Sequence, residues 1–263
     1  MGIEVYNEAE LDHVRHGGRI LSGALQLIEK SLRVGISTLE IDQIAEEFIR
    51  ANGGEPSFKG TYNYPFSVCT SINDEAVHGM PRADKIIADG DIVSVDVGVR
   101  YNGFCTDAAR TFAVGNVGPE ALDLIKHTEQ SFWESIRGLK AMSKVGDIGA
   151  RIEDYIKKNT TYSIIRTYLG HGIGKKPHQD PLIPNYRLDK KSKVGLKAHV
   201  RSRLPIGSII AIEPMINAGT ADVKLADDKW TVSTADGRLS AHYENTLIIL
   251  ADGVEVVTIH DKS

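Results

Sequence analysis

The chain has 263 residues, of which 41% are hydrophobic and 25% charged, a composition typical of a globular protein with one large core. A formal net charge of −4 gives no general reason to expect binding to nucleic acid or to an anionic membrane. The two cysteines form no disulfide framework, no apolar run is long enough to span a membrane, and no signal peptide is recognisable. We therefore expect one domain, residues 1–263, in the cytoplasm.

The chain alternates predicted helices and strands, which indicates an α+β protein. Apolar residues at helical spacing predict a first helix over residues 8–32. Ser37 and Glu40 form a capping box that begins a second helix, and Asn52-Gly53-Gly54 ends it. Further along, the patterns predict strands over 66–72 and 91–101, helices over 119–138 and 147–159, and buried strands over 208–213 and 244–250.

Two segments of the first half recur in the second half. Residues 34–41 resemble residues 145–152 at an offset of 111, and residues 90–96 resemble residues 207–213 at an offset of 117. Two matches in the same order predict a duplicated α/β unit whose halves form one shared site. The predicted halves span approximately residues 8–115 and 119–250.

Five side chains that can bind metal stand at strands or strand ends: Asp96, Asp107, His171, Glu213 and Glu244. A carboxylate within an apolar strand is costly to bury as an ion unless a cation pairs with it. Two divalent metal ions would neutralise four carboxylates together, and oxygen and imidazole ligands suit such ions. The pattern therefore predicts a dinuclear metal centre.

Asp96 and Asp107 flank the turn Tyr101-Asn102-Gly103, so the two carboxylates are expected side by side on a hairpin. The alternative is that both are ordinary strand acids paired with Arg100 or Arg110.

The segment from His171 to His178 is rich in glycine, which lets the backbone pass close to a bound ion or substrate. It lacks the spacing of a phosphate-binding loop. Cys69 with His78 or His171 could form a nucleophilic pair, but no orienting partner is identifiable in the sequence. We expect Cys69 instead to be packed or to line a pocket.

The chain resembles the type I methionine aminopeptidases over nearly its whole length. The resemblance rests on Ser67–Asn73 with His78-Gly-Met-Pro81, Asp91–Gly98, Asp107, Gly170–Gly174 with His178, Ile212-Glu-Pro214, Trp230 and Ser240–Thr246. The resemblance implies the pita-bread fold, with two pseudo-symmetric α/β halves around a central antiparallel sheet. It also implies metal-dependent removal of the N-terminal methionine from nascent proteins and peptides whose second residue is small.

The resemblance assigns roles to the metal ligands. Asp96 would chelate one ion, Asp107 and Glu244 would bridge both ions, and His171 and Glu213 would complete the second site. The ions would be two of Co, Mn, Fe or Zn, and they would activate a water for attack on the scissile carbonyl.

The resemblance also assigns the catalytic and substrate-binding residues. Glu213 would carry a proton to the leaving amine, His178 would hydrogen-bond the carbonyl oxygen, and His78 would contact the scissile amide nitrogen. The methionine side chain would lie among Phe58, Tyr64, Cys69 and Trp230, where plain core packing is the alternative for Phe58 and Tyr64. A monovalent cation would lie near Asn73, Glu75 and Ser240.

Several positions depart from the family pattern. Thr61 stands where relatives often carry tyrosine and is expected to alter the pocket rim. His242 stands where glutamine is common and Asn245 where histidine is common, and both are expected to tune the surroundings of the ligands.

The segment 187–205 is long and basic, with Lys190, Lys191, Lys193, Lys197, Arg201 and Arg203. It is either a solvated surface loop or a contact with ribosomal RNA.

Two other functions are compatible with parts of the pattern. A proline-specific aminopeptidase or dipeptidase of the same fold usually carries a large extra N-terminal domain, whereas only about 60 residues precede the first motif here. A metal-free binding protein would not need five intact ligands. The resemblance also implies that the protein is a monomer.

Overall fold

The structure is a computed structural model that describes residues 2–189 and 194–259. Its first two helices, α1 (Glu8–Ser31) and α2 (Thr38–Ala51), both begin at capping boxes. Asn7 accepts the backbone N–H of Glu10 at 3.1 Å, and Ser37 accepts that of Glu40 at 3.2 Å. These side chains satisfy backbone donors that have no partner within the helix. The capping box predicted from the sequence is confirmed.

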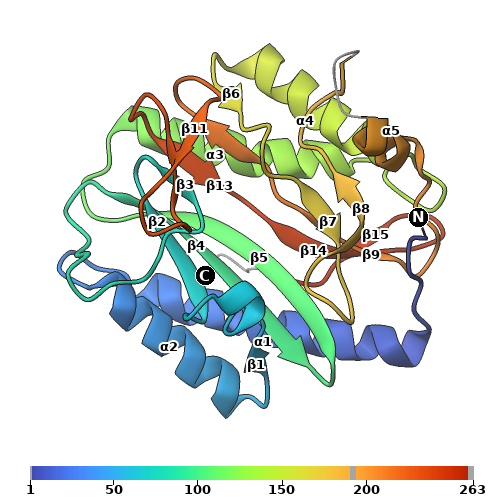
Figure 1. Cartoon of the computed structure of the whole chain (residues 1–263), viewed down its shortest axis with the longest axis horizontal. Helices are drawn as coiled ribbons and strands as arrows, with labels where there is room; N and C mark the ends of the chain where they lie inside the picture. Colours follow the sequence, from blue (N-terminus) through green and yellow to red (C-terminus); the bar gives the residue numbers. More distant parts are fainter. Residues whose placement is uncertain (1, 190–193, 260–263) are drawn as a thin grey trace.

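Strands β2 (Val68–Ile72), β4 (Ile92–Tyr101) and β5 (Phe104–Ala113) form an antiparallel sheet beside these two helices. Their apolar face packs on α1 and α2 in a core that includes Leu21, Leu25, Val93, Val95 and Val97. Figure 1 shows α1 and α2 lying along one side of these strands. The sheet therefore keeps its other face for polar side chains.

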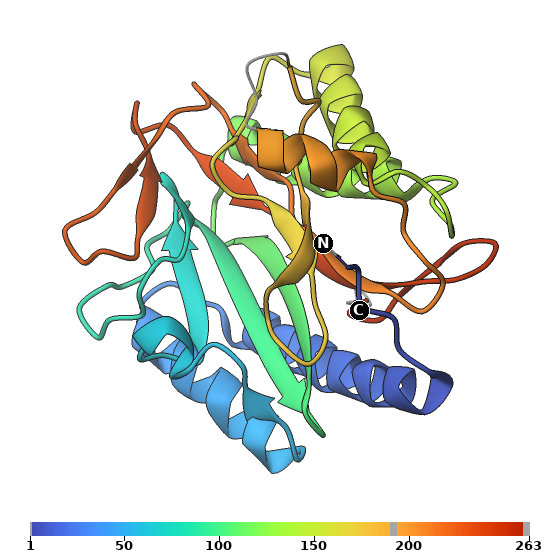
Figure 2. The same ribbon diagram turned by 45° about the vertical axis from the view of Figure 1, so that its right-hand side comes forward.

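A second group of helices and strands forms the rest of the chain. Helices α3 (Pro119–Ile136) and α4 (Val145–Asn159) pack on the sheet β15-β14-β9-β7-β8 through Phe132, Ile148, Ile152, Ile212 and Leu247, among others. The strands of this sheet are β7 (Gly170–Gly172), β8 (Gln179–Ile183), β9 (Ile209–Ile212), β14 (Asn245–Ile249) and β15 (Val254–Val256). Figure 2 shows these helices and α1 with α2 on opposite sides of the strands.

Short elements complete the described chain. They are β1 (Glu55–Pro56), the 3₁₀ turn η1 (Thr61–Asn63), β3 (Glu75–Val77), β6 (Ser163–Ile164), β10 (Met215–Asn217), β11 (Val223–Leu225), β12 (Val232–Thr234), β13 (Ser240–His242) and helix α5 (Val194–Arg201). Every strand pairing found within residues 2–189 and 194–259 is antiparallel. No helix in these ranges is long and apolar enough to cross a membrane.

The two sheets meet where β5 passes the start of β14. Glu244 donates its backbone N–H to Ala109 at 3.0 Å, and Asp107 donates its own to the Thr246 hydroxyl at 2.8 Å. The central antiparallel arrangement therefore brings Asp107 and Glu244 together, although they lie far apart in sequence. The division into related halves, 8–115 and 119–250, stays a prediction.

The sequence patterns located the long elements to within two residues. The predicted helix 119–138 ends at Ile136, and the predicted helix 147–159 begins earlier, at Val145. The expected surface loop at 187–205 is corrected for residues 194–201, which form α5. Its His199 is buried and accepts the backbone N–H of Leu182 at 3.1 Å, so α5 is anchored to β8. Lys190, Lys191 and Lys193 lie outside the described residues.

Candidate metal centre and substrate cavity

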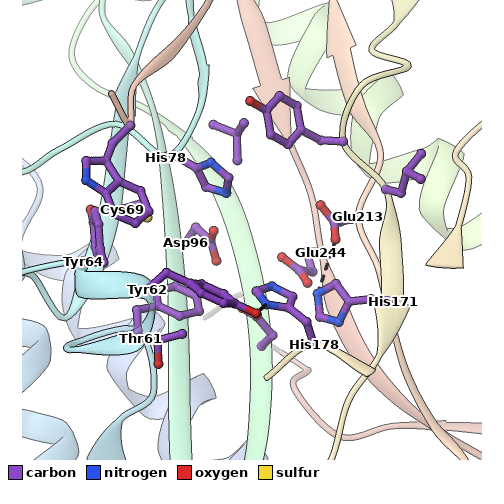
Figure 3. A pocket seen from close by; sticks show the side chains of 16 residues that line it. Thr61, Tyr62, Tyr64, Cys69, His78, Asp96, His171, His178, Glu213 and Glu244 are labelled. Atoms are coloured by element: carbon purple, nitrogen blue, oxygen red, sulfur yellow. Dashed lines mark hydrogen bonds and ion pairs between the residues drawn. The ribbon is translucent and has the colours of Figure 1, made fainter. Parts of the chain in front are cut away.

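The five predicted metal ligands meet at the junction of the two sheets, as Figure 3 shows for the four that it labels. Asp96 lies in β4 and Asp107 in β5, where the register pairs Asp96 with Ala109 and Gly98 with Asp107. The two acids are therefore diagonal neighbours on one face of the predicted hairpin.

The other three ligands come from the second sheet. His171 lies in β7, Glu213 directly follows β9, and Glu244 directly precedes β14. All five side chains are buried, with exposed fractions between 2% and 8%. Two groups of ligand atoms are close enough to hold an ion, with all atoms of each group within 4.8 Å of one another. One group is Asp107, His171 and Glu244, and the other is Asp96, His242 and Glu244.

The electrostatics of the carboxylates fit divalent cations. Burial raises the pKa of Asp96 to about 7. Burial, together with the charges of the neighbouring acids, raises the pKa values of Asp107, Glu213 and Glu244 well above their ordinary values. One oxygen of each of Asp96, Asp107 and Glu244 is buried without a hydrogen-bond partner among the described residues. Four buried acids, three of them with an unpaired oxygen, need positive charge, which two divalent ions would supply.

His171 is oriented as a metal ligand. Its Nδ1 lies 3.0 Å from the carbonyl oxygen of Gly172, which requires Nδ1 to be the protonated donor. Nε2 then keeps its lone pair, and it lies 3.5 Å from Oε1 of Glu213. Burial lowers the pKa of His171 to about 3, so the ring is neutral near pH 7. A neutral imidazole is the form that binds metal.

The alternative pairing of these acids with arginines is wrong. Arg110 donates to the carbonyl oxygens of Ala109 and Glu244, to Asn245 Oδ1 at 2.7 Å and to the carbonyl of Thr258 at 3.0 Å. Arg100 donates to the carbonyl of Lys175. In the part of the chain that the structure describes, neither guanidinium forms an ion pair with Asp96 or Asp107.

The acids open onto a cavity of about 240 Å³. Its lining comprises the five predicted ligands, both predicted catalytic histidines and all four predicted methionine-pocket residues, together with Thr61, Tyr62, Val77, Tyr168 and Leu169. Figure 3 shows side chains from both sheets pointing into this space. Val77, Tyr168 and Leu169 were not predicted. The position of Tyr168, three residues before His171, was the signal that could have indicated it.

The predicted methionine pocket lies directly beside Asp96. Cys69 in β2 pairs with Asp96 in β4, so both side chains lie on one face of the sheet. The Tyr64 ring packs edge-on against Trp230, with ring centroids 4.9 Å apart, and the Tyr64 hydroxyl donates to the carbonyl of Val68. Burial raises the pKa of the Cys69 thiol well above its ordinary value, and the Asp96 charge adds to this shift. Cys69 lines the cavity, as predicted, and its raised pKa does not favour the thiolate that a nucleophile requires.

Two histidines stand at the cavity on different elements. His78 follows β3 with a φ of 58° and packs edge-on against Tyr168 at 5.3 Å. His178 lies before β8, 4.5 Å from the His171 ring between centroids. Burial lowers the pKa of His78 to about 4 and also lowers the pKa of His178. Both rings are therefore neutral near pH 7 and can donate one N–H.

The predicted monovalent cation site is only partly assembled. The carbonyl of Asn73 accepts the backbone N–H of Ser240 at 2.9 Å, so these two residues are neighbours. The Glu75 carboxylate instead forms an ion pair with Lys85 and accepts the backbone N–H of Ile72. The cation near these residues stays a prediction.

The departures from the family pattern have different neighbours. Asn245 accepts hydrogen bonds from Arg110 and from the hydroxyl of Thr258 at 3.0 Å. Thr61 donates its hydroxyl to the carbonyl of Ser57 at 2.7 Å and lines the cavity. His242 joins Asp96 and Glu244, as described above.

Comparison with known proteins identifies the family to which this chain belongs. Residues 12–251 match the model of metallopeptidase family M24. The chain belongs to this family. A methionine aminopeptidase of Clostridium perfringens is 47% identical over 253 residues, covering 96% of this chain and 97% of that protein. The sequence-based resemblance is therefore confirmed.

Solved structures place the fold in the same way. The crystal structure of methionine aminopeptidase from Thermotoga maritima superposes with a TM-score of 0.91 at 32% identity, covering 98% of this chain and 99% of that one. An Xaa-Pro dipeptidase from Bacillus anthracis superposes with a TM-score of 0.77 at 22% identity, and the match covers only 63% of the dipeptidase chain. The predicted pita-bread fold is confirmed.

Proposed function

We propose that this chain is a metal-dependent aminopeptidase that removes the N-terminal methionine from nascent proteins and peptides whose second residue is small. The observation that carries the proposal is the position of an apolar, thiol-containing pocket directly beside a buried cluster of four carboxylates. Relatives that match 96–98% of the chain and bear the name methionine aminopeptidase support it.

The residues present fit two divalent ions of Co, Mn, Fe or Zn. Asp96 would hold one ion, His171 and Glu213 the other, and Asp107 and Glu244 would bridge them. The ions would supply Lewis acidity, which polarises the scissile carbonyl and makes water a usable nucleophile near neutral pH. The buried oxygens of Asp96, Asp107 and Glu244 that lack partners among the described residues are the natural ligand atoms.

The chain's own groups then handle the substrate and its protons. Glu213 passes a proton to the leaving amine, because its carboxylate lies at the cavity beside His171. His178 donates an N–H to the carbonyl oxygen as negative charge develops there. His78, which directly follows β3, contacts the scissile amide nitrogen.

The methionine side chain occupies the pocket formed by Phe58, Tyr64, Cys69 and Trp230. Aromatic rings and a protonated thiol make favourable contacts with a thioether. A monovalent cation near Asn73, Glu75 and Ser240 would stabilise the strand ends where these residues lie.

The proline-specific alternative is less well supported. The methionine aminopeptidase of Clostridium perfringens is 47% identical to this chain, whereas the dipeptidase of Bacillus anthracis is 22% identical to it. A metal-free binding role would not explain why four acids are buried together.

The test is release of methionine from Met-Ala-Ser, Met-Leu-Ser and an Ala-Pro control. Each peptide is assayed with EDTA-stripped protein and after addition of Co(II) or Mn(II). We expect metal-restored cleavage of Met-Ala-Ser and little cleavage of Met-Leu-Ser. Cleavage of Ala-Pro instead would assign the protein to the proline-specific group, and no cleavage with any metal would refute an aminopeptidase function.

We further propose that the enzyme acts as a cytoplasmic monomer and that the segment 187–205 contacts ribosomal RNA. The buried, unpaired Cys69 and Cys105 suit a reducing compartment. The exposed Arg201 and the lysines of this segment supply positive charge for phosphate contacts. Reversal of Lys197 and Arg201 to glutamate should reduce co-sedimentation with ribosomes at low salt, and unchanged co-sedimentation would reject the contact.

A further inference from the structure

His242 is a buried histidine that the metal-ligand set above does not use. It ends strand β13, two residues before Glu244, and only 2% of its surface is exposed. Its Nε2 lies 3.7 Å from Oε2 of Glu244. One ligand atom each from Asp96, His242 and Glu244 lies within 4.8 Å of the other two. The sequence pattern predicts for His242 only a role in tuning the surroundings of the ligands.

Each of these three side chains has a buried polar atom that lacks a partner among the described residues. His242 Nε2, Asp96 Oδ1 and Glu244 Oε1 are all buried, and none has a hydrogen-bond partner among the described residues. The 3.7 Å separation of His242 from Glu244 is too long for a hydrogen bond. A cation that accepts electron pairs from all three would satisfy an imidazole nitrogen and two carboxylate oxygens at once.

The backbone holds His242 in this position. Its N–H donates to the Thr111 hydroxyl at 2.9 Å, and that hydroxyl donates to the His242 carbonyl at 2.9 Å. Strand pairing with Met215 of β10 fixes the other edge of β13. The imidazole is therefore held near Asp96 and Glu244 before any ion arrives, as a metal ligand should be.

We infer that Nε2 of His242 is a direct ligand of the ion held by Asp96 and Glu244. This inference rests on the dinuclear centre of the proposed function and adds a ligand to it. Each ion then has one imidazole, His242 on one side and His171 on the other. A neutral imidazole adds no charge to the four carboxylates, but it shifts the preference of the site from Mn(II) towards Zn(II), Co(II) and Fe(II).

The test uses the full chain, stripped with EDTA and reloaded with Zn(II). In protein labelled with ¹⁵N at histidine, long-range ¹H–¹⁵N spectra count the imidazole nitrogens whose shifts change on coordination. We expect two such rings in the wild type, one in His242→Gln, and two in the control His78→Gln, which alters another cavity histidine. Calorimetric titration should show Zn(II) affinity at one site at least about 10-fold weaker in His242→Gln. The ratio of Zn(II) to Mn(II) affinity at that site should fall as well.

The outcomes distinguish failure of the His242 inference from failure of the proposed dinuclear centre. One coordinated ring in the wild type, with the same Zn(II) affinity in His242→Gln, overturns the inference and leaves the metal centre standing. This outcome would indicate a water molecule between His242 and Glu244. No Zn(II) binding by the wild type overturns both the inference and the proposed centre. Circular dichroism of the metal-free variants checks folding, and His242→Asn replaces His242→Gln if the latter does not fold.

Discussion

Replacement of Gly98 by alanine should destabilise the packing of the sheet and also weaken the binding of methionine. Gly98 lies in β4 on the same face as Asp96, and its carbonyl accepts the N–H of Ser57 at 2.9 Å. A Cβ at this position would lie 2.2 Å from Ser57 Oγ and 2.5 Å from Cε1 of Phe58. Phe58 lines the cavity, so the alanine presses on the predicted methionine pocket.

The size of the effect follows from these distances. Carbon atoms in contact lie about 3.5–4.0 Å apart, so the Phe58 ring must move by roughly 1 Å. Extra methylene groups in a packed site cost about 1–3 kcal/mol. For a chain of this size, we expect the Tm of Gly98→Ala to fall by about 2–10 °C. If the ring moves into the cavity, kcat/KM for Met-Ala-Ser should fall about 10-fold, mainly through KM.

The assay compares thermal unfolding and Met-Ala-Ser kinetics of four proteins. They are the wild type, Gly98→Ala, the Ser57→Ala/Phe58→Ala double variant, and the triple variant. Because the double variant removes both obstructing groups, adding Gly98→Ala to it should lower the Tm and raise KM much less than in the wild type. Gly253→Ala serves as a control, since its added Cβ meets no atom within 4 Å. An unchanged Tm and KM in Gly98→Ala, or an equal cost in both backgrounds, would refute the reasoning.

Three further predictions concern charge. Burial raises the pKa of Asp96 to about 7, so the metal-free folded protein retains a proton that the unfolded chain loses near pH 4. The Tm of the metal-free protein should therefore fall from pH 5 to pH 8. The increase in Tm on adding metal should be larger at pH 8 than at pH 5, and calorimetric scans at the two pH values measure both effects. A constant metal gain would contradict this. The Lys59 ammonium lowers the pKa of Glu46 from 4.5 to about 2, so Glu46 stabilises the fold above pH 4.5, and this stabilisation is lost as pH falls towards 2. Between pH 6 and pH 3, the Tm of Glu46→Gln should fall less than that of the wild type. Parallel curves of Tm against pH would argue against the ion pair. Tyr62 stacks on His178 with ring centroids 5.8 Å apart. Tyr62→Ala should expose His178, raise its lowered pKa, and move the acid limb of the kcat/KM profile to higher pH, whereas Tyr62→Phe should not. Coincident profiles of the two variants would show that the ring does not shield His178.

The sequence by itself determined the long elements and indicated the five candidate ligands. Capping boxes, apolar periodicity and acids within apolar strands are local signals, because helix starts and strand faces depend on neighbouring residues. The resemblance of ordered motifs then supplied the family and the cavity residues Phe58, Tyr64, Cys69 and Trp230.

Only the tertiary structure decided which atoms meet. Strands of two or three residues such as β7 and β13 carry no periodicity that a sequence can reveal, because their partners lie in distant segments. The pairing of Cys69 with Asp96 and the junction of Ala109 with Glu244 are long-range registers of this kind. The same packing directs Arg110 to Asn245 and brings His242 to Asp96. A histidine two residues before an acid is an ordinary sequence feature, and it acquires a chemical role only when a second sheet brings another carboxylate to it.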